Sequence, residues 1–381
     1  MLSTPPLVSI LTAFLIALIV TVVLTPVVRK IALRWRLGDK PNGRKFHPHM
    51  IPHLGGVAIV LGTVAGLVAA ILSAPGLAGG WRTSLLGLIP PVGMIVALGL
   101  VDDMKSLRVF QKLAIQVLVA VVLAVSGFVL FTGIAALDAV TAVVLLVSVS
   151  FLVGISSSVN LIDGHDGLAA GISLIAAVSF AVMAIMFGAD LVLVVTLSLI
   201  GACLGFLLFN LPPGKIYMGD TGSMFLGIML ALVACSLTAV QPTVQTFVAI
   251  SLILGIPMLD AFLAITRRLI LRTPIFKADC LHMHHILSEL SFSPKQTLFV
   301  MYSMQAFLAA LGLLVLKGYV FPIVVGLTFV AVVFSTFLRV MVVAQSEAPA
   351  APKLSTSSIP QMKEQRASAE SVARAVGGQG R

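Results

Sequence analysis

Carboxylate and amide side chains interrupt the hydrophobic sequence at three places, and their oxygen atoms suit a hard divalent cation such as Mg²⁺. One place is the adjacent pair Asp102 and Asp103, and another is Asp220, which has small neighbours in "MGDTGS". The third is the stretch "NLIDGHDGLAAG", which contributes Asn160, Asp163 and Asp166. Together these motifs predict one Mg²⁺ site, which could also take Mn²⁺.

Each motif also has an ordinary structural interpretation. The acidic pair could cap a helix end or lie in a solvated turn. The residues Asn160, Asp163 and Asp166 recur every three positions, which would place them on one side of a helix. The glycines between them could instead break the helix through Asx turns. Only the presence of all three motifs in one chain favours a shared site.

Positively charged side chains accompany the carboxylates and could neutralise phosphate groups. They are Arg44, Lys45, Lys112, Arg267 and Arg268. The "HMHH" stretch adds His282, His284 and His285. No cysteine or fourth histidine with the spacing of a transition-metal site accompanies these histidines, so we expect them to contact a phosphate or a sugar.

The elements that carry these motifs are hydrophobic helices. Of the 381 residues, 59% are hydrophobic and 10% are charged, whereas roughly a quarter of a soluble domain is charged. A membrane-spanning helix needs about 20 mostly apolar residues. The approximate centres of eleven predicted spans are Ile16, Gly62, Val92, Val121, Leu146, Val178, Thr196, Leu230, Leu254, Leu308 and Val325. We therefore predict an all-α integral membrane protein with about 11 transmembrane helices.

Basic residues predict the orientation of these helices, because they favour cytoplasmic loops. Of the 24 Lys and Arg residues, only Arg82 and Lys317 fall in loops predicted to lie outside. The N-terminus would then lie outside, and the C-terminus and the polar motifs on the cytoplasmic side. Residues 1–343 would form one membrane domain, and residues 344–381 a disordered cytoplasmic tail. The net charge of +10 follows from this topology and requires no nucleic acid.

A divalent cation surrounded by cationic side chains is typical of phosphoryl transfer, in which positioning and charge neutralisation supply most of the catalysis. The chain has no GxxxxGK[ST] motif, so it is not a P-loop ATPase. We therefore expect a phosphate substrate that is already at the membrane.

The ordered motifs resemble those of the polyprenyl-phosphate N-acetylhexosamine-1-phosphate transferase family, in particular its WecA/TagO branch. The stretch "DKPNGRKFHPHMIPHLGG" is similar to the first-loop signature of the family, "VDD" to its acidic pair and "NLIDGHDGLAAG" to its central motif. "GDTGS" and "HMHH" complete the series, which covers about residues 38–300. Two positions depart from the pattern: His165 stands where an apolar residue is common, and Cys280 where arginine is common.

The resemblance implies a reaction and a role for each motif. Members transfer a sugar-1-phosphate from a UDP-sugar to undecaprenyl phosphate and release UMP, which starts a lipid-linked surface glycan. The catalytic residues would be Asp102, Asp103, Asp163 and Asp166. Asp220 and Asn160 would hold the Mg²⁺ ion. The substrate-binding residues would be Lys45, Lys112, Asn160, Arg267, Arg268, His282, His284 and His285.

The resemblance also implies partners and a location. UDP-N-acetylhexosamine, with UDP-GlcNAc as the leading donor, and undecaprenyl phosphate would be the substrates. The protein would be a multi-pass protein of the bacterial inner membrane, with a homodimer as one option.

Three other functions are alternatives to this one. A phospho-MurNAc-pentapeptide translocase is the closest one within the family. The CDP-alcohol phosphotransferases need an arginine soon after an Asp-Gly pair, and Gly167 is followed by Leu168, Ala169 and Ala170. A cation-coupled transporter would use an acid inside an apolar helix, for which Asp260 is the candidate.

Overall fold

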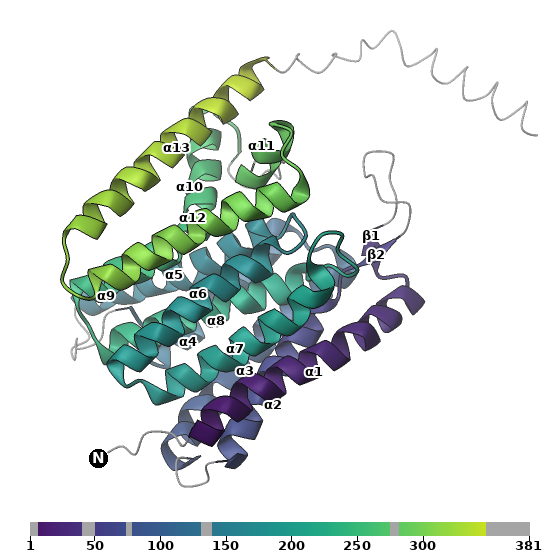
Figure 1. Ribbon diagram of the computed structural model, residues 1–381, viewed down its shortest axis with the longest axis vertical. Helices are drawn as coiled ribbons and strands as arrows, with labels where there is room; N and C mark the ends of the chain where they lie inside the picture. Colours follow the sequence, from purple (N-terminus) through teal and green to yellow (C-terminus); the bar gives the residue numbers. More distant parts are fainter. Residues whose placement is uncertain (1–6, 40–49, 74–77, 131–138, 275–281, 348–381) are drawn as a thin grey trace, which may run out of the picture. The chain divides into compact units, whose positions relative to one another are not determined.

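In the computed structural model of the chain, the described residues form helices and one pair of two-residue strands, joined by turns (Figure 1). It describes residues 7–39, 50–73, 78–130, 139–274 and 282–347. The elements are α1 (Leu7–Arg34), β1 (Gly38–Asp39), β2 (Ile51–Pro52), α2 (Gly55–Ser73), α3 (Ala78–Lys105), α4 (Val109–Val125), α5 (Ala139–Ile162), α6 (Leu168–Phe187), α7 (Asp190–Asn210), α8 (Gly219–Val240), α9 (Val244–Ile253), α10 (Gly255–Ile270), α11 (Met283–Glu289), α12 (Pro294–Val315) and α13 (Phe321–Glu347).

The helices have the length and composition of a multi-pass membrane protein. Among the described residues, nine helices could each cross a membrane, and the bent pair α9 and α10 would make a tenth span. Helix α4 is a shorter apolar helix. Ten of the eleven predicted centres lie inside a helix, and the remaining one, Leu254, lies at the 74° bend between α9 and α10. The helical membrane fold agrees with the prediction, and the bend is a feature that hydropathy does not reveal.

The chain divides into two compact units, Met1–Leu338 and Arg339–Arg381. Helix α13 continues to Glu347, so the helix extends four residues into the predicted tail of residues 344–381. The rest of that predicted tail lies outside the described residues.

The core of the first unit consists of α6, α7 and α8. These helices pack against one another, and α5 packs on α8 while α1 and α2 pack on α7 (Figure 1). Their buried residues cover nearly the whole circumference of each helix, as expected of helices surrounded by other helices. The outer helix α1 buries small residues such as Ala13, Ala17 and Thr21 on one side and exposes larger apolar residues on the other. An apolar exposed side is the surface that lipid requires.

Close glycine contacts let α2, α3 and α8 meet at their ends. A Cβ atom added to Gly99 of α3 would lie 2.4 Å from Thr221 Cα, and one added to Gly56 of α2 would lie 2.1 Å from the Gly222 nitrogen. Both contacts are with the backbone of α8, which cannot move aside as a flexible side chain could. The first turn of α8, which carries Asp220, is therefore fixed by direct backbone packing.

Substituting Gly99 by alanine is expected to destabilise the protein by about 1–3 kcal/mol, because overpacking a rigid contact forces the backbone apart. Gly93→Ala on the same helix is the matched control, because a Cβ atom at Gly93 meets nothing within 4 Å. That control should be neutral or slightly stabilising, since alanine favours helix over glycine. Thermal unfolding of the detergent-solubilised variants measures both effects, and equal melting temperatures would refute the packing argument.

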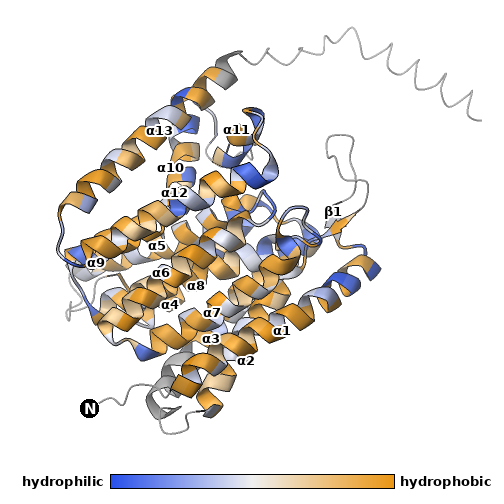
Figure 2. Ribbon diagram, viewed as in Figure 1, coloured by the Kyte–Doolittle hydropathy of each residue, from blue (hydrophilic) through white to orange (hydrophobic). Residues whose placement is uncertain are grey.

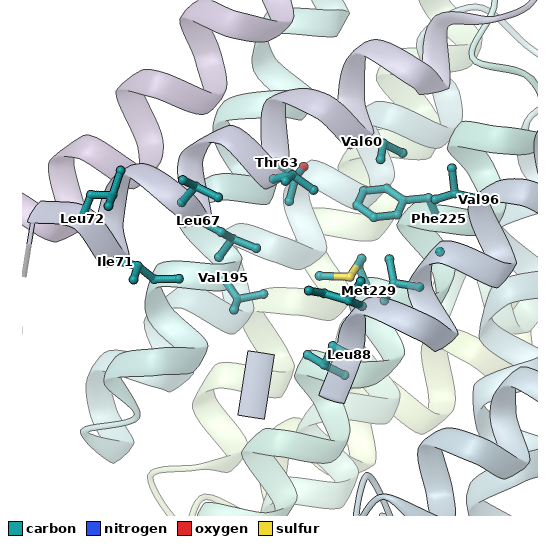
Figure 3. Close-up of a pocket in the computed structure, with 15 residues that line it drawn as sticks. Val60, Thr63, Leu67, Ile71, Leu72, Leu88, Val96, Val195, Phe225 and Met229 are labelled. Atoms are coloured by element: carbon teal, nitrogen blue, oxygen red, sulfur yellow. The ribbon is translucent and has the colours of Figure 1, made fainter. Parts of the chain in front are cut away.

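An apolar pocket of about 540 Å³ lies between α2, α3, α7 and α8 (Figure 3). Its lining includes Val60, Leu67, Val96, Phe225 and Met229, and Thr63 supplies the one hydroxyl group among the lining side chains. A lining of this kind cannot stabilise a charged or strongly polar group. The chemistry that the acidic motifs predict must therefore take place elsewhere, at the helix ends.

Candidate active site

The acidic motifs meet at one end of the first unit. Hydrogen bonds and ion pairs join the end of α3 to the start of α8, the start of α4 to the start of α8, and the end of α5 to the start of α8. Hydrophilic residues gather at the helix ends near α11 and β1, whereas the helix walls are hydrophobic (Figure 2). Motifs more than 100 residues apart in the sequence, such as Asp103 and Asp220, are thereby neighbours in space.

Lys112 links two of the carboxylates. Its Nζ atom forms an ion pair with Asp102 and donates a hydrogen bond of 2.9 Å to Asp220 Oδ2. Asp102 is 3% exposed, and its Oδ1 atom accepts a hydrogen bond of 2.7 Å from the Leu107 nitrogen. A buried carboxylate needs a cation or several hydrogen-bond donors. Lys112 supplies the cation, and the Leu107 N–H group supplies a donor. The sequence prediction that Asp102, Lys112 and Asp220 share a site agrees with this geometry.

Asp103 caps the beginning of α8. Its carboxylate accepts hydrogen bonds from the backbone nitrogens of Asp220 (2.7 Å) and Thr221 (3.1 Å), and from the Thr221 hydroxyl (2.6 Å). The first N–H groups of a helix have no partner within the helix, and a negative charge there is also favoured by the helix dipole. The capping interpretation of the acidic pair therefore holds for Asp103, although the cap serves a distant helix and not its own.

Removing this cap should lower stability. Asp103→Ala deletes the acceptor of three donors, and the loss of an N-cap typically costs about 0.5–2 kcal/mol. Met104→Ala, at an exposed neighbouring position, serves as the control and should unfold at the wild-type temperature. If Asp103→Ala lost activity without any change in unfolding temperature, Asp103 would act on the substrate and not on α8.

Asn160 connects α5 to α8. Its Nδ2 atom donates to Asp220 Oδ1 (2.6 Å) and to Ser223 Oγ (2.9 Å). Both hydrogen bonds use the amide nitrogen, so the amide oxygen is the atom that Asn160 can offer to a cation. The Asp220 side chain is 31% exposed, which leaves its carboxylate accessible from the open side of the site.

Asp163 and Asp166 do not continue the helix of Asn160. Helix α5 ends at Ile162, so the expectation that the three residues share one helix side is wrong, and the glycine-rich turn that was the alternative is found. Asp166 faces the loop before α8, where its Oδ2 atom accepts from the Gly214 nitrogen at 2.8 Å. Asp163 is half-buried, and burial raises its pKa well above the usual range. The charges of Asp220, Asp103 and Asp166 raise that pKa further, so a bound cation would favour the ionised form of Asp163.

The described oxygen atoms fit an Mg²⁺ ion that is only partly bound by protein. Among the described residues, no group of three or more His, Cys, Asp or Glu side chains is arranged to hold a metal ion. Asp220 and Asn160 offer a carboxylate and an amide oxygen, which are ligands that Mg²⁺ prefers, and Mg²⁺ commonly completes its shell with water and substrate phosphates. The two residues therefore suit such an ion better than a metal enclosed by protein ligands.

The three histidines form a cluster around the start of α11. His284 and His285 have ring centroids 4.2 Å apart, and the rings of His282 and His284 are stacked at 6.0 Å. The ring centroid of His165, from the central motif, lies 6.4 Å from that of His284, so a fourth histidine joins the cluster, although these side chains are not arranged to hold a metal ion. A Cβ atom on Gly164 would lie 2.6 Å from His284 Nε2. The cluster therefore lies directly against the central motif.

His284 and His285 are suited to hydrogen bonding more than to ion pairing. Burial, together with the neighbouring His285, His282 and His165, lowers the pKa of His284 to about 2. Burial and His282 also lower the pKa of His285. Neutral rings can donate and accept hydrogen bonds to a sugar hydroxyl or amide, but they do not neutralise a phosphate.

The remaining predicted residues lie on α10 or outside the described part of the chain. Arg267 is buried and Arg268 half-buried near the end of α10, the helix that carries Asp260. Lys45, Arg44 and Cys280 lie outside the described residues.

Several polar residues that position the site were not singled out from the sequence. Asn210, at the end of α7, accepts from the Gly167 nitrogen (2.9 Å) and donates to the Ile216 oxygen (2.9 Å). The Tyr302 hydroxyl of α12 donates to the Gly167 oxygen at 2.5 Å. Asn210 begins the "NLPPG" stretch after an apolar run, which could have indicated it, whereas Tyr302 has no local signal.

The fold and this site define a multi-pass helical membrane protein with a lysine-linked group of carboxylates at one end of its helices. Comparison with known proteins agrees with that class. The family model described as "Glycosyl transferase family 4" matches residues 85–238, which include the carboxylates, Lys112 and Asn160.

Individual relatives extend the match over most of the chain. A probable undecaprenyl-phosphate N-acetylglucosaminyl 1-phosphate transferase of Bacillus subtilis (strain 168) is 33% identical over 86% of this chain and 90% of its own length. A decaprenyl-phosphate N-acetylglucosaminephosphotransferase of Mycolicibacterium smegmatis is 32% identical over 76% of this chain and 77% of its own length. A phospho-N-acetylmuramoyl-pentapeptide-transferase of Desulforudis audaxviator is 32% identical over 82% of this chain and 99% of its own length. The chain belongs to the polyprenyl-phosphate N-acetylhexosamine-1-phosphate transferase family, as its motifs predict.

Proposed function

We propose that this protein transfers a sugar-1-phosphate from a UDP-sugar to undecaprenyl phosphate and releases UMP, with N-acetylglucosamine-1-phosphate as the leading group transferred. The single observation that carries the proposal is the joining of Asp102, Lys112, Asn160 and Asp220 at the ends of apolar helices. A charged site at the end of membrane helices lets a lipid-borne phosphate meet a water-soluble nucleotide.

The reaction forms one P–O bond and breaks another. An oxygen of the lipid phosphate attacks the sugar-bound phosphorus of the UDP-sugar, and UMP leaves with the bridging oxygen of the diphosphate. A phosphate monoester has a second pKa near 6, so the attacking phosphate is mostly dianionic at neutral pH and requires no strong base. This argument fits the described contacts of Asp102 and Asp103, which are engaged with Lys112 and with the start of α8.

The residues of the site would act chiefly by positioning and by neutralising charge. Asp220 and Asn160 would hold Mg²⁺, which would neutralise charge on the donor diphosphate. Lys112 contacts two carboxylates in the structure, and its ammonium group would also help to neutralise the substrate phosphates. The histidine cluster would contact the sugar, and Asp163 and Asp166 would shape the space between the donor and the lipid.

The proposed setting is the cytoplasmic face of the bacterial inner membrane. Among the described residues, counting α4 and the bent α9–α10 pair as spans gives eleven, which would place the N-terminus outside and the C-terminus inside. The distribution of Lys and Arg in the sequence supports that orientation. A homodimer belongs to the same proposal.

Two other functions make different predictions. The match to a phospho-N-acetylmuramoyl-pentapeptide-transferase over 99% of its length favours UDP-MurNAc-pentapeptide as the second donor to test. The transporter alternative has lost its main support, because both oxygens of Asp260 are hydrogen-bonded within the protein.

The test is an assay of the purified protein with undecaprenyl phosphate, Mg²⁺ and either UDP-GlcNAc or UDP-MurNAc-pentapeptide. UMP release together with a pyrophosphate-linked lipid sugar is expected with UDP-GlcNAc. Turnover of the pentapeptide donor alone would keep the reaction and change its substrate. A folded protein that released UMP from no UDP-sugar would refute the proposed function.

A further inference from the structure

Asp102, Lys112, Asn160 and Asp220 form what we call the Lys112 cluster. A buried carboxylate outside this cluster is hydrogen-bonded to the start of α11 through both of its oxygens. Asp260, in α10, is 1% exposed. Its Oδ2 atom lies 2.8 Å from His282 Nδ1, and its Oδ1 atom accepts from the Met283 nitrogen at 2.8 Å. Each oxygen of this carboxylate thus has one partner, and both partners belong to the beginning of the histidine segment.

This arrangement fixes the hydrogen position on His282. A carboxylate oxygen can only accept, so Nδ1 must carry a hydrogen atom whether the ring is neutral or protonated. The Nε2 atom is then the ring atom that remains for another partner. Carboxylates that orient a histidine in this way act on the tautomer and the ring angle and not on the substrate itself.

The same carboxylate holds the N-terminal end of α11. This helix has seven residues, and a helix so short is not stable without tertiary contacts. Met283, Ile286 and Leu287 anchor it through buried apolar side chains. The polar anchor at its first turn is Asp260, which donates no hydrogen and accepts the Met283 N–H that would otherwise have no partner within the helix.

The position of α11 in turn sets the position of the other two imidazoles. His284 is 2% exposed, and neither of its ring nitrogens has a hydrogen-bond partner among the described residues. The ring of His284 contacts the rings of His282, His285 and His165. A rotation at the start of α11 would therefore move the α11 histidines relative to His165 and the central motif.

We propose that Asp260 is a positioning residue of the transferase: it fixes the tautomer of His282 and the start of α11, and so places the histidine cluster for the sugar nucleotide. The inference rests on the proposed function and assigns Asp260 no contact with either substrate. It predicts a defect specific to the UDP-sugar, because the lipid phosphate would meet the Lys112 cluster on other helices.

The test replaces Asp260 by asparagine, which has nearly the same shape. Its NH₂ group would face one of the two donors that Asp260 accepts from, His282 Nδ1 or the Met283 nitrogen. We expect Asp260→Asn to lower kcat/KM for the UDP-sugar by about 10–100-fold, as for other residues that orient a catalytic ligand. The KM for undecaprenyl phosphate should not change. In a His282→Ala background, Asp260→Asn should not lower kcat/KM for the UDP-sugar any further, because the two residues act as one unit.

The controls separate positioning from stability and from the proposed function. Glu289→Gln changes an exposed carboxylate at the far end of α11, the helix that Asp260 anchors, and should behave as wild type. Asp260→Glu, which keeps the charge, should recover part of the lost donor efficiency. Equal donor kinetics of wild type and Asp260→Asn, or losses that add fully to those of His282→Ala, would overturn the inference, as would failure of both Asp260 variants to fold. Absence of UMP release by the wild type would instead refute the proposed function.

Discussion

Asp220→Asn is expected to lower kcat by on the order of 10³-fold while leaving the protein folded in the membrane. Asp220 is contacted by Lys112 and by Asn160, and it is the carboxylate that would hold Mg²⁺. Asparagine has nearly the same shape but no charge, so the variant keeps the packing of α8 and loses the electrostatic part of the site. Removing one group that stabilises charge in a transition state typically costs about 10²–10³-fold, and a lost metal ligand adds to that.

The matched control for this variant is Asp190→Asn. Asp190 also lies in the first turn of an apolar helix, α7, but at the end away from the cluster. UMP release and the Mg²⁺ concentration for half-maximal activity are measured for both variants. Wild-type turnover is expected for Asp190→Asn. More than a tenth of wild-type turnover by Asp220→Asn would show that Asp220 is not the principal cation ligand.

Lys112→Met should lower both stability and activity. The substitution leaves Asp102, whose side chain is 1% exposed, without its cation, and breaking a buried ion pair by removing one partner costs about 3–5 kcal/mol. It also leaves Asp102 and Asp220 to repel each other where the proposed reaction would place the substrate phosphates. We therefore expect an unfolding temperature well below that of wild type and a loss of activity of about 10²-fold or more.

A double variant separates these two effects. Lys112→Met combined with Asp102→Asn removes the uncompensated charge, so it should regain most of the stability but none of the activity. Lys105→Met changes an exposed lysine at the end of α3 and should alter neither property. The assignment of Lys112 would be wrong if the double variant turned over at the wild-type rate, or if Lys112→Met unfolded at the wild-type temperature.

The helices could be predicted from the sequence because membrane spans are long and nearly free of charge. Hydropathy located ten centres inside observed helices, but it could not locate the bend at Leu254, since both sides of the bend are apolar. The short pairing of β1 with β2 was not predicted either, because strands of two residues carry no periodic signal.

The candidate site was predictable as a set of residues but not as a set of contacts. Motif order indicated that Asp102, Lys112, Asn160 and Asp220 belong together, and the structure brings them within hydrogen-bonding distance. The roles of Asp103 and Asp260 depend on backbone N–H groups of α8 and α11, which a sequence does not display. Tyr302 acts through a backbone oxygen 135 residues away, so local spacing could not identify it.

Because Asp260 attaches α11 to α10, the histidine cluster and the carboxylate and lysine network are held by different helices. The carboxylate and lysine network uses the ends of α3, α4, α5 and α8, and the matched family model, residues 85–238, contains all of it and stops before α11. The histidine cluster is held by a different helix through a different carboxylate. Under the proposed function, mutations that accumulate in the segment between α10 and α12 during evolution would alter which sugar is accepted without rebuilding the phosphate chemistry. Segment exchange between relatives becomes a rational route to new donor specificity on one membrane scaffold.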